Sequence, residues 1–372
     1  MLHQVILTNH NLLAVCQMHG RNVSYIGRLD HLRFLAAFMV LMYHTNILFN
    51  APDTYHLAIF DNGYTGVSLF MVISGFILTL ITYEKQIDIK SFYTNRVLRI
   101  YPIFIVVVSL GYFATPDPRE TSVGIDYLMA MLPISNLYRL KYGQYGGHLW
   151  SVMVEMQFYF MFPFLAAYVR KAGIVFYIAI IGLMCAMRVI VFVLTGTIYA
   201  SAYFSMLGSL DMFVIGCLAG ILHKRTTDYT VGWYVWPFLL LAINGLLFVA
   251  HAAFEKFNAS AIWIIWPTIQ AISWAGLLLS YVKSSRSIPL SSVFAYLGRI
   301  SYSIYAWHVI AIMLARIVVP SLFAHPYVVG ALFVLPATVL MAAISYYVIE
   351  LPFLSKRMNY TSKCQLGHGR SI

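Results

Sequence analysis

Residues 63–83 read GYTGVSLFMVISGFILTLITY, a run of 21 residues without a charged side chain. A helix needs about 20 predominantly apolar residues to cross the hydrocarbon core of a bilayer, which is about 30 Å thick. The whole chain agrees with this run, because 61% of its 372 residues are hydrophobic and only 10% are charged. Soluble domains average about 45–50% apolar and about 25% charged residues. The composition therefore excludes an ordinary soluble or disordered protein and predicts a membrane protein.

Ten apolar runs of this kind, separated by polar breaks, predict an all-α polytopic membrane protein with about ten transmembrane helices. Their approximate bounds are Leu32–Phe49, Gly63–Tyr83, Ile100–Thr115, Leu149–Val169, Ile174–Leu194, Ser201–His223, Trp233–His251, Ala261–Val282, Ile300–Val319 and Tyr327–Ile349. We expect one transmembrane domain over residues 29–355, between an amino-terminal extension (1–28) and a carboxy-terminal tail (356–372). Met18 is a second candidate start of translation, in which case part of the extension is untranslated in the cell; disorder of that part is the other expectation.

The positive charge of the chain is distributed one-sidedly. The sequence has 24 Lys and Arg against 13 Asp and Glu, a formal net charge of +11. With both termini in the cytoplasm, 18 of the 24 basic residues fall in cytoplasmic segments, as the positive-inside rule requires. The charge thus predicts a multi-pass protein of the inner or plasma membrane, with membrane lipid and no nucleic acid among its partners. The sequence leaves the oligomeric state open.

The first span carries two ionisable residues, Arg33 and His44. Such groups cost about 2.5–3.5 kcal/mol each at membrane depth on insertion scales, so they mark candidate functional sites. A separation of eleven residues places the two on one helix face, about 16 Å apart along the axis. The alternative interpretation of Arg33 is a snorkelling residue at the membrane boundary. The alternative for His44 is a core imidazole that hydrogen-bonds to a backbone carbonyl.

Two further arginines, Arg96 and Arg99, precede the third span. A spacing of three residues places them on one face of a helix that leads into the membrane. Guanidinium groups so placed suit a polyphosphate, because each can make two charge-assisted bonds to phosphate oxygens. Attraction to anionic lipid headgroups is the alternative interpretation.

The fourth span carries His148, Ser151 and Glu155 on one helix face. A carboxylate at that depth needs a cationic or imidazole partner, and His44 is a candidate for it; structural pairing with another helix is the alternative. The ninth span repeats this polar pattern at Ser301, Tyr305 and His308.

Other features narrow the chemistry. Arg188 and Asp211 lie on adjacent spans and are expected to neutralise each other. The four cysteines are scattered without metal or haem spacing, so we expect no metal site. The chain also lacks a Walker phosphate loop, a Gly-x-Ser-x-Gly elbow and a His-Glu-x-x-His motif. Proton transfer by histidine, with arginines holding an anion, is the chemistry that these residues favour.

Seven segments together resemble acyltransferase family 3, a family of integral membrane proteins that includes O-antigen and exopolysaccharide acetylases. They are Leu29–Arg33 with His44, Gly66–Gly75, Phe92–Pro102, Trp150–Tyr159, Leu210–Asp211, Gly298–Ser303 with His308, and Glu350–Pro352. The resemblance implies transfer of an acyl group, usually acetyl, from cytoplasmic acyl-CoA to a hydroxyl of a cell-surface or exported carbohydrate, such as lipopolysaccharide or exopolysaccharide. The chain departs from the family where Asp30 and Arg33 are not followed by glycine, and where Met156 replaces the second acid after Glu155.

The resemblance and the spacing together assign roles. Arg33, Arg96 and Arg99 are expected to hold the phosphates of acyl-CoA, which is a donor substrate and not a bound cofactor. His44 is expected to act as general base or, alternatively, as transient acyl carrier, with Glu155 orienting its imidazole. The secondary candidates are His148, Ser151, Asp211, Ser301 and His308.

The expected acceptor site is an aromatic mouth at the outer side of the membrane. Aromatic rings there offer flat apolar faces with polar edges, which suit sugar rings; an interfacial aromatic belt is the alternative use. The mouth residues are Tyr138, Tyr142, Tyr145 and Trp150. Two other functions stay open at this point. A proton-coupled transporter would also use buried ionisable groups, and a catalytically silent subunit of polysaccharide export is the third possibility.

Overall fold

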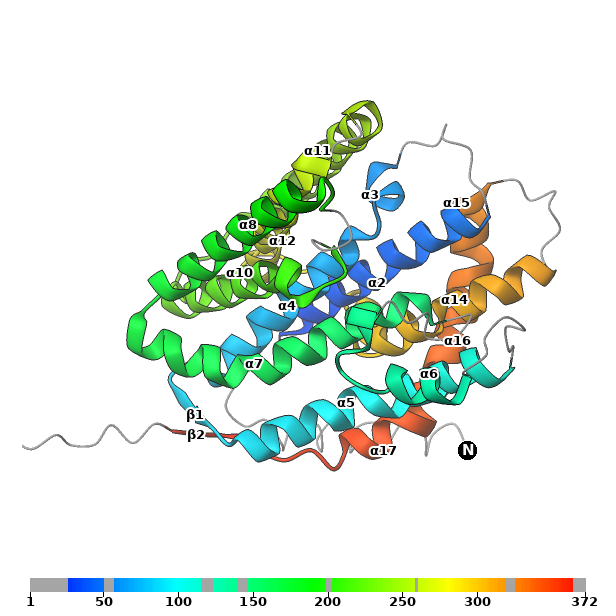
Figure 1. Ribbon diagram of the computed structural model, residues 1–372, viewed down its shortest axis with the longest axis horizontal. Helices are drawn as coiled ribbons and strands as arrows, with labels where there is room; N and C mark the ends of the chain where they lie inside the picture. The colour runs from blue at the N-terminus through cyan, green and yellow to red at the C-terminus, as the bar shows by residue number, and fades with distance from the viewer. Residues whose placement is uncertain are drawn as a thin grey trace, which may run out of the picture.

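A computed structural model describes residues 26–49, 57–114, 123–138, 146–198, 203–257, 260–318 and 325–363. Figure 1 shows the long helices packed side by side, with α8, α10, α11 and α12 on one side of the bundle and α14 and α16 on the other. The helices are α2 (Gly27–Leu48), α3 (Ala58–Asp61), α4 (Thr65–Thr82), α5 (Ile89–Ser109), α6 (Val123–Ala130), α7 (Trp150–Ala172), α8 (Val175–Thr195), α10 (Met206–Arg225), α11 (Val235–Phe257), α12 (Trp266–Val282), α13 (Ser291–Arg299), α14 (Ser301–Val318), α15 (Pro326–Val329), α16 (Leu335–Ser345) and α17 (Leu351–Leu354); the strands are β1 (Lys85–Ile87) and β2 (Thr361–Lys363).

Six helical segments of the described chain are long and apolar enough to cross a membrane. They are Thr65–Thr82, Ile89–Phe113, Gly147–Ala172, Val175–Thr195, Ser301–Val318 and Pro326–Leu354. This confirms the prediction of a helical membrane protein. Each of the ten predicted runs overlaps a helix, but the number of crossings and the orientation of the termini stay predictions.

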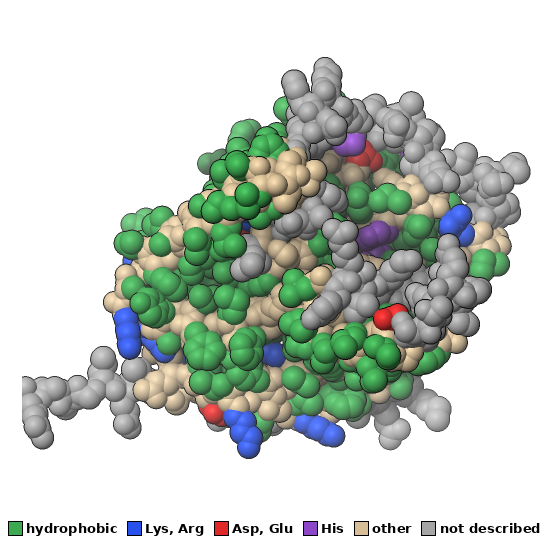
Figure 2. All heavy atoms as spheres, in the orientation of Figure 1, with side chains coloured by type: hydrophobic (Ala, Val, Ile, Leu, Met, Phe, Trp, Pro, Cys, Tyr) green, Lys and Arg blue, Asp and Glu red, His purple; other side chains and the backbone are tan. Residues whose placement is uncertain are grey.

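The apolar surface of the bundle is typical of helices that face lipid. Val193 and Leu194 of α8 keep 74% and 77% of their surface exposed, and Ile317 of α14 keeps 81%. In Figure 2 hydrophobic side chains cover much of the face in view, and most of the visible Lys and Arg lie in its lower half. This separation of charge from apolar surface agrees with a bundle that sits in a bilayer.

The centre of the bundle depends on glycines that let two helices approach at the backbone. A β-carbon at Gly75 of α4 would lie 2.0 Å from the carbonyl oxygen of Phe213 on α10. A β-carbon at Gly216 of α10 would lie 2.1 Å from the carbonyl oxygen of Val72 on α4. Small residues at helix contacts are the usual means of close packing in membranes.

Helix α5 extends well beyond the predicted span Ile100–Thr115, because it begins at Ile89. Asp88 caps its start by accepting a hydrogen bond from the Ser91 backbone N–H, 3.4 Å away. The helix therefore carries Arg96 and Arg99 directly into the apolar segment.

The segment after α17 returns to the start of α5. Strand β2 pairs antiparallel with β1, with Ser362 opposite Gln86. Between α17 and β2, the side chain of Asn95 on α5 donates to the carbonyl oxygen of Met358 (2.7 Å) and accepts from its backbone N–H (2.9 Å). The otherwise helical fold thus uses two short strands to hold residues 355–363 against α5.

Candidate active site

Three histidines from three parts of the chain meet in the bundle. His44 lies on α2, His148 in the short turn before α7, and His308 on α14. The ring centroids are 5.0 Å apart for His44 and His308, 4.5 Å for His148 and His308, and 6.3 Å for His44 and His148. We call these residues the histidine cluster. The structure thus brings two of the secondary candidates to the predicted base.

The hydrogen bonds of the cluster assign the tautomer of His44. His308 Nδ1 lies 2.6 Å from the carbonyl oxygen of Tyr305 and donates to it, so the neutral ring keeps an accepting Nε2. His44 Nδ1 lies 3.0 Å from the carbonyl oxygen of Val40 and 3.1 Å from His308 Nε2, two acceptors for one N–H. A neutral His44 therefore carries its proton on Nδ1 and presents the lone pair of Nε2, which is the form a general base requires.

The third histidine has unused hydrogen-bonding capacity. His148 is buried, with 5% of its surface exposed. Neither of its ring nitrogens has a hydrogen-bond partner in the part of the chain that the structure describes. Its carbonyl oxygen accepts from the Tyr305 hydroxyl at 2.8 Å, and that hydroxyl lies 2.6 Å from Ser151 Oγ. The unpaired imidazole nitrogens leave His148 able to bind a polar group of a substrate.

The predicted contact between Glu155 and His44 is absent from the described residues. Glu155 Oε1 accepts hydrogen bonds from Ser74 Oγ on α4 and from the Tyr159 hydroxyl, both at 2.5 Å. The reason is the rotation of α7, which turns Glu155 toward α4 and its own following turn. Among the described residues, His308 is the side chain that lies within hydrogen-bonding distance of the His44 ring, and Glu155 lies on the α4 side of α7.

The three arginines predicted to bind the phosphates of the donor lie away from the histidine cluster. Arg33 pairs with Asp30 (3.0 Å), and Arg99 pairs with Glu350 (3.4 Å). Arg96 donates to the Tyr360 hydroxyl at 3.2 Å. Its guanidinium carbon also lies over the rings of Phe92, Tyr159 and Tyr360, at 5.2, 5.1 and 5.6 Å.

A fourth arginine, Arg357, joins these three. Burial lowers its pKa, and the positive charges of Arg99, Arg96 and Arg33 lower it further. The sequence assigned Arg357 only to the basic tail, because nothing local indicates that the chain returns to α5. We call Arg33, Arg96, Arg99 and Arg357 the arginine cluster.

A line of contacts connects the arginine cluster to the histidine cluster. The contacts are Arg96 with Tyr159 (5.1 Å, guanidinium carbon to ring), Tyr159 with Glu155 (2.5 Å), Ser151 with Tyr305 (2.6 Å), Tyr305 with His148 (5.2 Å between rings) and His148 with His308 (4.5 Å). Glu155 and Ser151 are one turn apart on α7 and close the line. We call these side chains the polar column. They include Tyr305, which the sequence placed in the polar pattern of the ninth span, and Tyr159, which it did not single out for the site.

The remaining candidates are not members of this column. Asp211 pairs with Arg188 at 2.5 Å and accepts from Thr268 Oγ1 at 2.5 Å, which agrees with mutual neutralisation. Ser301 is buried at the start of α14. Trp150 packs against Tyr203 and Phe204, with ring centroids 5.0 and 4.7 Å away. Tyr142 and Tyr145 lie outside the described residues, and so does the Tyr138 side chain.

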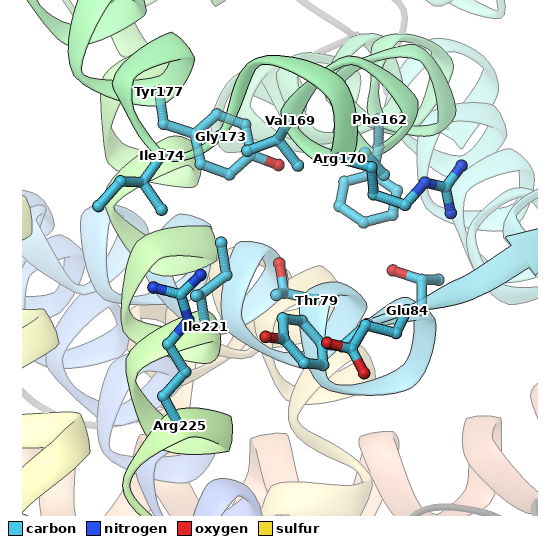
Figure 3. A pocket seen from close by; sticks show the side chains of 13 residues that line it. Thr79, Glu84, Phe162, Val169, Arg170, Gly173, Ile174, Tyr177, Ile221 and Arg225 are labelled. Carbon is cyan, nitrogen blue, oxygen red and sulfur yellow. The ribbon is translucent and has the colours of Figure 1, made fainter. Parts of the chain in front are cut away.

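A separate cavity of about 250 Å³ lies between the ends of α4, α7, α8 and α10. Figure 3 shows Arg170 and Glu84 on one side of it and Arg225 on another. It contains none of the predicted site residues. The described part of the chain also holds no group of three His, Cys, Asp or Glu side chains arranged for a metal ion.

Comparison with known proteins gives an independent result. A family model described as an acyltransferase domain matches residues 26–350. Proteins named O-acetyltransferase OatA from Staphylococcus aureus strains NCTC 8325 / PS 47, COL and MRSA252 are each 25% identical over 370 residues, covering 89% of this chain. The chain spans 58% of the length of these relatives. No solved structure gives a significant match.

Proposed function

The chain belongs to the acyltransferase domain family, and we propose that it is a membrane O-acetyltransferase that moves acetyl from acyl-CoA to a carbohydrate hydroxyl. The family match confirms the predicted resemblance and the predicted class of enzyme. The name of the relatives supports acetyl as the group and oxygen as its acceptor atom. Acyl-CoA as donor and carbohydrate as acceptor are part of our proposal.

The polar column is the observation that carries the proposal. The arginine cluster at one end offers guanidinium groups for a polyphosphate, and the histidine cluster at the other offers a base. Arg33 and His44 lie eleven residues apart on α2, which is about 16 Å along the helix axis. The extended pantetheine arm of CoA is of this order of length. A donor with its phosphates at the arginines would therefore present its thioester near His44.

The reaction follows from the tautomer of His44. The acceptor hydroxyl donates to His44 Nε2, and its oxygen forms a bond to the thioester carbonyl carbon as the proton moves to the imidazole. The carbon–sulfur bond then breaks, and the CoA thiolate takes the proton from the imidazolium. The products are an O-acetyl ester and free CoA, and His44 returns to its neutral form.

His308 and His148 support this cycle in the proposed mechanism. The His308 Nε2 lone pair accepts the Nδ1 proton of His44 and stabilises the positive charge that the imidazole gains. His148, with two unpaired ring nitrogens, is placed to donate to the oxygen of the tetrahedral intermediate. Glu155 accepts from the Tyr159 hydroxyl, whose ring lies against the Arg96 guanidinium, so it lies on the donor side of the column.

An aromatic group beside His44 is the proposed acceptor surface. The ring of Tyr43 lies 5.3 Å from that of His44 and 5.6 Å from that of Tyr64. Tyr64 in turn contacts Tyr203 and Trp263, with ring centroids 5.5 and 6.2 Å away. Faces of this kind suit a sugar ring whose hydroxyl points at the base.

The proposed acceptor is tested in the source cells. Surface and exported glycans are purified from a strain lacking this protein and from the complemented strain, and their O-acetyl signals are compared by NMR. We expect one O-acetyl signal to disappear and to return on complementation with the wild-type protein, but not with His44→Ala. Identical glycan spectra from all strains would contradict a carbohydrate acceptor.

A further inference from the structure

The chain directly after Arg357 is held against α5 by contacts that the transmembrane sequence does not predict. The segment Ser355–Lys363, which we call the carboxy-terminal strap, is fixed by the two hydrogen bonds between Asn95 and Met358. Beyond Arg357, the Tyr360 ring is buried, 5.3 Å from that of Phe92. Strands β1 and β2 then close the segment. The segment that carries Arg357 is therefore placed against α5 by its neighbours Met358 and Tyr360.

The arginine cluster has more positive than negative charge. The described residues form two ion pairs in this cluster, between Arg33 and Asp30 and between Arg99 and Glu350. Arg96 and Arg357 have no carboxylate within ion-pair distance among the residues that the structure covers. The Nε atoms of both are buried, and neither has a hydrogen-bond partner in the described segments.

The positive charges of Arg33, Arg96 and Arg99 act unfavourably on the charged form of Arg357, and burial makes that repulsion stronger than in water. The lowered pKa of Arg357 expresses both effects. Such an arrangement is stabilised by a ligand that brings two or more negative charges and many acceptor oxygens. Phosphate esters have this chemistry, whether they belong to CoA or to a lipid headgroup.

We propose that Arg357, together with Arg96, binds a phosphate group of the acyl-CoA donor, which makes the carboxy-terminal strap part of the donor site. This rests on the proposed function, since it takes acyl-CoA as the donor. CoA is favoured over a lipid phosphate because the arginine cluster lies at one end of the polar column and the proposed base, His44, lies at the other.

The test compares two acetyl donors that share a thioester and differ in phosphate. Acetyl-CoA carries three phosphate groups, and S-acetylpantetheine carries none. Arg357→Gln should lower kcat/KM for acetyl-CoA by about tenfold or more, through KM, and leave kcat/KM for S-acetylpantetheine unchanged. Lys356→Gln is the matched control, because it removes the same charge from the neighbouring, exposed residue. It should change neither value.

Several outcomes would overturn the proposal. Wild-type kcat/KM for acetyl-CoA in Arg357→Gln, or an equal loss with both donors, would mean that Arg357 does not bind the donor phosphates. An equal loss in Lys356→Gln would assign the effect to general surface charge and lipid. If Arg357→Gln does not accumulate, Arg357→Lys serves instead and should lose less, but still only with acetyl-CoA. A wild-type protein that uses neither donor would refute the proposed function itself.

Discussion

His308 Nε2 on α14 lies 3.1 Å from His44 Nδ1 on α2, so one helix carries the proposed base and another contacts its ring. The carbonyl oxygen of Val40, one turn earlier on α2, shares the same Nδ1 proton at 3.0 Å. Two acceptors on the Nδ1 side fix the orientation of the imidazole and leave Nε2 for the substrate. We therefore assign to a neutral imidazole the orienting role that was predicted for a carboxylate, Glu155.

Substitution of His308 should affect turnover more than donor binding. His308→Ala removes the acceptor that stabilises the His44 imidazolium, and we expect kcat to fall about tenfold to a hundredfold while KM for acetyl-CoA stays near wild type. His308→Gln, whose carboxamide oxygen can accept in the place of Nε2, should recover part of kcat. Steady-state kinetics on purified protein measure both values. A rise in KM without a fall in kcat would contradict a positioning role.

Glu155 should be coupled energetically to Tyr159. The Tyr159 hydroxyl donates to Glu155 Oε1 at 2.5 Å, so Glu155→Gln and Tyr159→Phe disturb one shared bond. We expect their effects on kcat/KM to be less than additive, with a coupling of about 0.5–3 kcal/mol. The same cycle with Glu155→Gln and His308→Gln should be close to additive. Strong coupling to His308 and none to Tyr159 would restore the predicted contact with the histidines.

Gly75 tests the packing of α4 against α10. Alanine there would place a β-carbon 2.0 Å from the Phe213 carbonyl oxygen, so we expect Gly75→Ala to destabilise the protein by about 1–3 kcal/mol or more. Gly182→Ala on α8 is the control, because nothing lies within 4 Å of its β-carbon. It should be neutral or stabilise α8 by up to about 1 kcal/mol. Thermal unfolding in detergent distinguishes them; equal melting temperatures would contradict the packing.

The ion pair of Arg188 and Asp211 should matter for stability and not for acetyl transfer. Both side chains are almost fully buried, so Arg188→Gln leaves a buried carboxylate without its cation, at a cost of about 3–5 kcal/mol. Arg316→Gln, at an exposed site on α14, should cost less than about 0.5 kcal/mol. The fraction of Arg188→Gln protein that folds should have the kcat of the wild-type protein. A well-folded Arg188→Gln protein with no activity would place this pair in the site.

The fold and the site were predictable from the sequence to different degrees. Apolar run lengths located the helices, because the bilayer sets that length. Helical spacing put Arg33 and His44 on one face, and residue chemistry singled out His148 and His308. The partner of Glu155 was not predictable, since equal depth does not determine which neighbour a helix faces.

Arg357 shows a second limit of sequence reasoning. Its place depends on the pairing of β2 with β1, more than 270 residues earlier in the chain. The strands are three residues each and carry no local pattern that would reveal their pairing. A charge in a tail therefore has the same appearance in the sequence as a charge in a binding site.

The most direct test of the account is acetyl transfer by membranes that contain His44→Ala. Membranes with equal amounts of wild-type or variant protein receive acetyl-CoA labelled in its acetyl group, and alkali-labile label in the carbohydrate fraction is measured over time. General-base catalysis predicts that the initial rate falls by about a hundredfold or more in the variant. A rate in the variant within about twofold of wild type would contradict His44 as the catalytic base.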